Sequence, residues 1–131
     1  GKEVEMDYDV VPSAIFTSPE IANVGLDPEQ AEEKGIDFKT GYFPFRANGK
    51  ALAQGERQGF IKLIQEKNSG KIIGGKIIGT HASDLISEVT LAIKNELTAE
   101  DIAETIHTHP TTAEVIHEAA LDLAEESIHY A

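Results

Sequence analysis

Two apolar segments rich in β-branched residues stand close together near the middle of the chain. Residues 59–66 (GFIKLIQE) and 71–79 (KIIGGKIIG) are separated only by KNSG, which ends in a turn-forming glycine. Such a pair predicts an antiparallel β-hairpin. Gly74 and Gly75, inside the second segment, indicate a bulge or the close approach of another backbone.

Two further segments have the composition of strands. Residues 10–17 (VVPSAIFT) predict a short strand, and Pro12 restricts its start to the edge of a sheet. Residues 36–45 (IDFKTGYFPF) predict an aromatic-rich strand. Residues 1–10 are charged and aperiodic, which predicts a loose lead-in, and residues 46–58 predict a loop with one helical turn.

Helix start and stop signals follow the first strand. Asp27 can cap a helix, Pro28 suits its first position, and Gly35 ends it. The segment between the first strand and Asp27 carries no strand prediction.

Helical spacing dominates the last third of the chain. Apolar residues at i, i+1, i+4 and i+8 predict a helix over residues 82–95. Thr98 then caps a short helix over residues 99–105, and an apolar stripe predicts a final helix over residues 112–122. Strands first and helices last predict an α+β fold, an antiparallel β-sheet packed with helices, in one domain over residues 1–131.

The composition narrows the class of protein. The 131 residues include 11 Lys and Arg against 23 Asp and Glu, a net charge of −12, and no Cys. The acidic balance argues against a nucleic-acid partner. The lack of cysteine excludes a disulfide framework and a thiolate metal site in these residues. No apolar run approaches the ~20 residues of a membrane span and no signal peptide opens the chain, so we expect a cytoplasmic protein without a membrane partner.

Residues 106–118 (IHTHPTTAEVIHE) hold three of the five histidines and two carboxylates. One interpretation is purely structural. Thr111 and Glu114 fit a capping box, in which Thr111 caps the final helix and Glu114 reaches back to its amide. Pro110 then ends the preceding segment. This interpretation gives the histidines no role.

Three other interpretations use the histidines. His107 and His109, with Glu114 or His117, could hold a metal ion. The two imidazoles could instead form a recognition or packing surface. In the third, His109 is a general base whose ring is oriented by the carboxylate of Glu114. Glu114 would then exchange its capping bond for the bond to His109.

One family carries a closely similar segment. The sequence HTHPTTAE (107–114) resembles the signature of the carboxy-terminal dimerisation domain of flavin-dependent pyridine nucleotide–disulfide oxidoreductases. PSAIFTSPEIANVG (12–25) resembles the opening strand and loop of that domain, and FPF (43–45) with the hairpin segments resembles its sheet. Residues 81–111 are similar to its closing helices, so the resemblance covers almost the whole chain. Within the family the sequence is nearest to the dihydrolipoamide dehydrogenases, while glutathione reductase shares the HPT core but differs around PEIANVG (19–25) and after Glu114.

The resemblance implies a role for the His-Pro turn. In such enzymes the domain forms the interface of a homodimer, and the turn projects into the other subunit's active site beside a flavin and a cysteine pair. By this resemblance His109 is the acid–base catalyst and Glu114 its carboxylate partner. The backbone carbonyl of His107 meets the partner's flavin. The His109–Pro110 bond is commonly cis, a conformation with a low free-energy cost only when the peptide bond precedes proline. His117 is expected to neighbour the pair.

The resemblance also implies an activity, the oxidation of dihydrolipoamide with NAD through FAD. A 2-oxo acid dehydrogenase complex core is an implied further partner. The FAD and NAD domains and the cysteine pair are absent from this sequence, so we expect an isolated fragment that is inactive alone and holds no cofactor tightly. The alternatives are the interface domain of another disulfide reductase, such as glutathione reductase, and a non-catalytic binding or dimerisation module. His81 and His129 are expected to be surface or packing residues.

Overall fold

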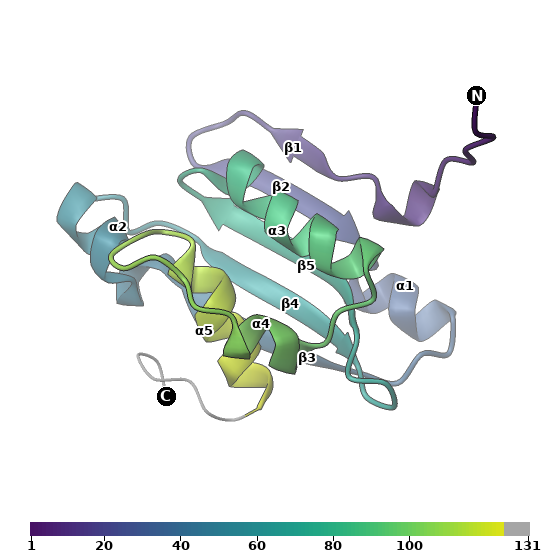
Figure 1. The fold of residues 1–131 in the computed structure, drawn as a ribbon. Helices are drawn as coiled ribbons and strands as arrows, with labels where there is room; N and C mark the ends of the chain where they lie inside the picture. The colour runs from purple at the N-terminus through teal and green to yellow at the C-terminus, as the bar shows by residue number, and fades with distance from the viewer. Residues whose placement is uncertain (125–131) are drawn as a thin grey trace.

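A five-stranded antiparallel sheet forms the body of the molecule in the computed structural model, which describes residues 1–124 (Figure 1). The strand order is β1-β2-β5-β4-β3. The strands are β1 (Ser13–Ile15), β2 (Glu20–Gly25), β3 (Phe38–Pro44), β4 (Phe60–Glu66) and β5 (Ile72–Gly79). The helices are α1 (Pro28–Glu33), α2 (Gly49–Gln54), α3 (Ala82–Lys94), α4 (Ala99–Glu104) and α5 (Glu114–Leu123), with 3-10 turns at Tyr8–Val10 and Phe45–Ala47.

Three helices cover one face of this sheet. Helix α3 packs on β2 and β5, α5 packs on β3 and β4, and α4 lies against α5 (Figure 1). The core between the two layers is aliphatic and aromatic, and its largest fully buried side chains are Phe43, Phe45, Ile61, Leu63, Ile72, Ile77, Ile116, Val24, Val89 and Val115. The predicted α+β fold, an antiparallel sheet packed with helices, is therefore confirmed.

The predicted hairpin is present as β4 and β5. Ile64 pairs with Gly74 and Gln65 pairs with Ile72, so Ile73 is an extra residue in β5 and the register shifts there. A Cβ atom on Gly74 would lie 1.9 Å from the carbonyl oxygen of Leu26. Both the bulge and the close backbone approach expected from the paired glycines are thus confirmed.

Strand β2 corrects the sequence-based interpretation, which assigned no strand to residues 20–25. Only three of its residues are apolar, and the polar residues Glu20 and Asn23 fall on opposite faces of the strand, which gives a weak strand signal. The strand is specified instead by its pairing with β1 on one side and β5 on the other. Strand β1 is shorter than predicted, covering Ser13–Ile15 within residues 10–17, and it lies at the sheet edge as expected.

Helix α2, with six residues, is longer than the single helical turn predicted within residues 46–58. Asn48 accepts a hydrogen bond from the Ala51 amide at 2.9 Å, which caps the helix. Gly55, in the left-handed conformation with φ 77°, ends it. A helix this short with glycine as its first residue has too little periodicity to be recognised from sequence.

The predicted starts of α1 and α3 are confirmed, and α3 ends at Lys94, one residue earlier than predicted. Asp27 accepts from the Gln30 amide at 2.8 Å, and the Gln30 side chain accepts from the Asp27 amide at 3.0 Å, so α1 begins with a reciprocal capping box. Helix α3 has no cap from the residue before it. Its cap comes from strand β2, because Glu20 accepts from the Ser83 amide at 2.9 Å.

The hydrogen bond that caps α3 also changes the pKa of its acceptor, Glu20. The hydrogen bond from the Ser83 backbone lowers the pKa of Glu20, and the Ser83 hydroxyl and the charge of nearby His81 add to this effect.

Within residues 1–124, no helix has the length and apolar character needed to cross a bilayer.

Candidate functional site: the His-Pro turn

The turn between α4 and α5 begins at a well-defined helix. Thr98 and Asp101 form a capping box at the start of α4, with the Thr98 amide donating to Asp101 at 2.7 Å and the Asp101 amide donating to the Thr98 hydroxyl at 3.1 Å. The hydrogen bond from the Thr98 backbone, then that from its hydroxyl, lowers the pKa of Asp101. The predicted cap and helix are confirmed, and α4 ends at Glu104, one residue earlier than predicted.

The turn itself contains a cis peptide bond between His109 and Pro110, as the resemblance implied. The Thr111 hydroxyl donates to the Thr108 carbonyl at 2.7 Å and closes the turn. The Thr111 carbonyl accepts from the Asn48 side-chain amide at 3.0 Å. Because Asn48 also caps α2 and is buried, it ties the turn to a distant part of the chain.

His109 and Glu114 meet across this turn. The Nδ1 of His109 lies 2.8 Å from Oε1 of Glu114, and the imidazole is 76% exposed while the carboxylate is 22% exposed. The other carboxylate oxygen, Oε2, accepts from the Thr111 amide at 2.8 Å. Because Nδ1 contacts Glu114, Nε2 lies on the opposite side of this largely exposed ring.

This geometry corrects two expectations. Glu114 does not exchange its bond to the Thr111 amide for the bond to His109, because its two oxygens make the two bonds at once. The Thr111 hydroxyl donates to the Thr108 carbonyl, and the N-cap residue of α5 is Ala113 and not Thr111. Helix α5 accordingly begins at Glu114, two residues later than predicted, and its N-cap Ala113 supplies no side-chain bond.

His107 points inward, away from His109. Its Nε2 lies 2.7 Å from Oε1 of Glu88 in α3, and its Nδ1 lies 2.9 Å from the Thr105 carbonyl oxygen. Its ring centroid lies 5.1 Å from that of His117, whose Nε2 donates to the Ala103 carbonyl at 2.9 Å. His117 therefore contacts His107 and not the His109 pair.

The remaining histidines lie outside the turn. His81 precedes α3 in the left-handed conformation, is 56% exposed, and lies 3.7 Å from Asp84. His129 is outside the described residues. Across residues 1–124, no group of three His, Cys, Asp or Glu side chains is arranged to hold a metal ion.

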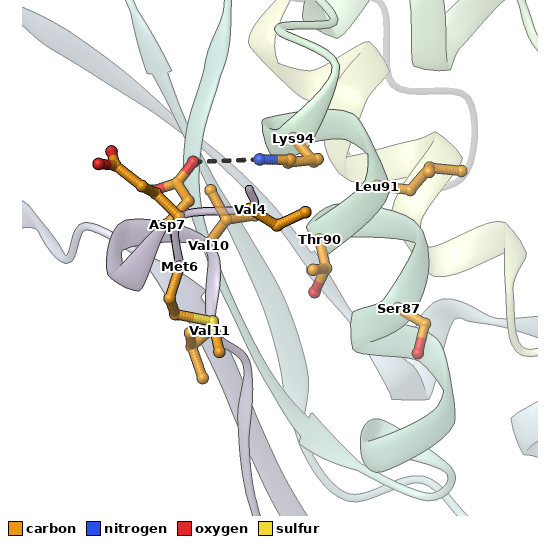
Figure 2. Close-up of a pocket in the computed structure, with 10 residues that line it drawn as sticks. Val4, Met6, Asp7, Val10, Val11, Ser87, Thr90, Leu91 and Lys94 are labelled. Atoms are coloured by element: carbon orange, nitrogen blue, oxygen red, sulfur yellow. Dashed lines mark hydrogen bonds and ion pairs between the residues drawn. The ribbon is translucent and has the colours of Figure 1, made fainter. Parts of the chain in front are cut away.

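An apolar helix surface flanks the turn. Leu91 of α3 is 62% exposed and Ile106 of the turn is 96% exposed. Both line one groove beside α4, and Leu91 also borders a second groove against the N-terminal segment (Figure 2). In that second groove Lys94 lies 3.5 Å from Asp7, and the contact joins the N-terminal segment to α3 (Figure 2).

Comparison with known proteins agrees with the fold. The family model described as the pyridine nucleotide-disulphide oxidoreductase dimerisation domain matches residues 11–120, and the chain belongs to this family. The predicted resemblance to the interface domain of these reductases is confirmed. The family implies a homodimer.

Curated relatives narrow the family further. The chain is 54% identical over 129 residues to the dihydrolipoyl dehydrogenase of Chlamydia muridarum, covering 98% of this chain and 28% of the relative. It is 51% identical over 120 residues to that of Bacillus subtilis, covering 92% of this chain and 26% of the relative. The chain thus spans little more than a quarter of the length of these relatives.

Solved structures show the same architecture. LpdA from Mycobacterium tuberculosis superposes with a TM-score of 0.84 at 31% identity, covering 89% of this chain and 26% of that chain. The HOCl-induced flavoprotein disulfide reductase RclA from Escherichia coli has a TM-score of 0.78 at 25% identity, covering 81% of this chain and 24% of that one.

Proposed function

We propose that this chain is the interface and acid–base domain of a flavin-dependent dihydrolipoamide dehydrogenase, which oxidises dihydrolipoamide with NAD. The observation that carries the proposal is the exposed imidazole of His109 held by one oxygen of Glu114. A carboxylate on Nδ1 fixes the tautomer in which Nε2 is free to take a proton. The substrate class is inferred from the similarity of this chain to dihydrolipoyl dehydrogenases.

The chemistry that His109 would perform is proton transfer to and from a thiol. A dithiol attacks a disulfide only as a thiolate, and a free thiol is mostly protonated at neutral pH. The Nε2 of His109 would take the thiol proton, and the carboxylate of Glu114 would stabilise the resulting imidazolium. A positioned base of this kind contributes roughly 10²–10⁴ to the rate.

FAD and NAD would be held mainly by other parts of the enzyme. The glycine-rich stretch of this chain is strand β5, where Gly74 and Gly75 lie inside the sheet and allow close packing, whereas the glycines of a phosphate-binding loop lie between a strand and a helix. The turn instead fits a role at the border of a flavin site, because His107 directs its ring inward while Pro110 is exposed. The backbone carbonyl of His107 would face the flavin of the partner subunit. When bound, FAD supplies the electron transfer between dithiol and NAD.

The helical surface around Leu91 and Ile106 would form the contact between the two subunits of the homodimer. Exposed apolar side chains that border two grooves are typical of an interaction site. The net charge of −12 supports a contact with basic segments of a 2-oxo acid dehydrogenase complex core. The lack of cysteine in these residues fits a cytoplasmic location.

The test is a chimera in which this chain replaces the matching 26% of the Bacillus subtilis dihydrolipoyl dehydrogenase. We expect a dimeric flavoprotein that oxidises dihydrolipoamide with NAD, and His109→Ala should lower that rate by about 10²–10⁴. The matched control is His81→Ala, at an exposed histidine outside the turn. A chimera that dimerises and binds flavin without turnover would contradict the proposal and indicate a non-catalytic interface module.

A further inference from the structure

A second imidazole–carboxylate pair lies behind the first, between His107 of the turn and Glu88 of α3. The Nε2 of His107 is 2.7 Å from Oε1 of Glu88. The His107 ring is only 8% exposed, whereas Glu88 is 34% exposed and keeps contact with water. This pair has no part in the acid–base chemistry assigned to His109.

The hydrogen-bond partners of His107 determine where its protons are. A backbone carbonyl oxygen can only accept, so the Nδ1 of His107 must donate to the Thr105 carbonyl at 2.9 Å. A neutral imidazole carries one N–H, and its other nitrogen can only accept. An ionised carboxylate also only accepts, so the 2.7 Å contact with Glu88 requires a second N–H on the ring.

The alternative is a protonated Glu88 that donates to a neutral ring. The surroundings disfavour it, because Glu88 is 34% exposed and contact with water stabilises the charged form of a carboxyl group. Two further titratable groups lie nearby among the described residues: His117 of α5, whose ring packs on that of His107, and Asp101 of α4, which lines the same groove. The His117 Nε2 donates to the Ala103 carbonyl, so that bond is satisfied by a neutral ring.

We infer that Glu88 is a positioning residue: its carboxylate keeps His107 as a charged imidazolium and thereby fixes the turn that presents His109. The His107 ring joins three elements, since it bonds α3 through Glu88, bonds the end of α4 through the Thr105 carbonyl, and packs on α5 through His117. Charge-assisted hydrogen bonds are about twice as strong as neutral ones.

The turn depends on this anchor because it has little apolar packing of its own. Ile106, Thr108, His109 and Pro110 are all exposed. Anchoring comes from polar contacts: the His107 pair before His109, and the Thr111 contacts with Asn48 and Glu114 after it. Loss of the charge on Glu88 should therefore loosen the turn without unfolding the sheet and its helices.

The first test is the ¹⁵N spectrum of the histidine side chains in this 131-residue chain at pH 7.5. We expect His107 to show two protonated ring nitrogens where free imidazole is mostly neutral. Glu88→Gln should abolish that signature, because the amide keeps the shape but not the charge. The control Glu114→Gln should leave it unchanged. A neutral His107 in the unsubstituted chain would overturn the inference.

The second test concerns the consequence for catalysis, which rests on the proposed function. In the Bacillus subtilis chimera, Glu88→Gln should lower kcat for dihydrolipoamide oxidation by roughly 10–100-fold, as expected for a base displaced by about 1 Å. The KM for NAD should not change. An inactive unsubstituted chimera would count against the proposed function and leave the ¹⁵N result standing. An active chimera with normal kcat after Glu88→Gln would contradict the positioning role.

Discussion

The two carboxylate oxygens of Glu114 serve two different groups, His109 and the amide of Thr111, each at 2.8 Å. One bond orients the imidazole, and the other satisfies a backbone donor at the entry to α5. The side chain that begins the helix is therefore the same one that contacts the imidazole of His109. Orientation of His109 and formation of α5 are coupled through a single residue.

Substitution of Glu114 should separate these two roles. Glu114→Gln keeps a hydrogen-bonding side chain but removes the charge, so we expect a loss of dihydrolipoamide oxidation in the chimera with near-normal stability. Glu114→Ala removes both bonds and should also lower the free energy of unfolding by about 1 kcal/mol, the usual net value of a hydrogen bond. Thermal unfolding and turnover of both variants would be measured.

The control for this pair is Glu104→Gln, at an exposed position of α4 outside the turn, which should change neither quantity. Unchanged dihydrolipoamide oxidation in Glu114→Gln would show that the charge contributes nothing to catalysis.

The close approach of α5 to β3 should make Gly41 sensitive to substitution. A Cβ atom there would lie 2.1 Å from the Ala119 carbonyl oxygen and 2.7 Å from Cγ of Leu123. Next to it, the Tyr42 amide donates to Asp122 at 2.7 Å, which holds the helix to the strand. Gly41→Ala should therefore lower the free energy of unfolding by about 1–3 kcal/mol, measured by denaturant titration.

Gly49→Ala is the matched control, because nothing lies within 4 Å of a Cβ atom at this helical glycine. It should leave stability unchanged or raise it slightly. If both glycine variants behaved alike, close packing of α5 on β3 could not be the cause.

The cap that Glu20 provides for α3 should make stability depend on pH. The Ser83 hydrogen bond lowers the pKa of Glu20 in the folded state, so its stabilisation is present above the unfolded value of 4.5 and is lost as the pH falls through the folded value. At pH 7, Glu20→Gln should lower the free energy of unfolding by about 0.3–1 kcal/mol.

Below pH 4.5 this difference between Glu20→Gln and the unsubstituted chain should shrink, and urea titrations between pH 3 and 7 would measure it. Glu32→Gln, at an exposed position of α1, serves as the control. A difference that stays constant over the whole range would show that the charge of Glu20 does not stabilise α3.

The exposed leucine of α3 should control self-association. Leu91→Glu places a charge on the surface that the two subunits would share, so we expect sedimentation velocity to show a shift from dimer to monomer in the chimera. Leu52→Glu, at a 42% exposed leucine of α2, is the control and should remain dimeric. A dimer that persists in Leu91→Glu and dissociates in Leu52→Glu would place the interface elsewhere.

Local signals in the sequence were sufficient for most of the fold. The hairpin, α1, α3 and α4 were predictable because apolar spacing and caps such as Asp27 and Thr98 lie within a few residues of what they specify. Strand β2 was not predictable in this way, because only its pairing with two neighbouring strands makes it a strand. Weak alternation in a short segment leaves the choice to tertiary contacts.

The site was predictable to a similar extent. His109 and Glu114 are five residues apart, so their contact across a turn was accessible to reasoning from spacing. Asn48 is 63 residues from Thr111, and Glu88 is 19 residues from His107, so neither anchor left a local signal. The simultaneous use of both Glu114 oxygens also required the three-dimensional geometry.

The most direct test of the central claim compares two rates in the chimera carrying His109→Gln. One is the oxidation of dihydrolipoamide with NAD, which requires a base for the thiol. The other is the oxidation of NADH by an artificial electron acceptor, which involves no thiol. If His109 is the base, the first rate falls by about 10²–10⁴ and the second stays at the unsubstituted level. If dihydrolipoamide oxidation continues at the unsubstituted rate, or both rates fall together, His109 is not the acid–base residue.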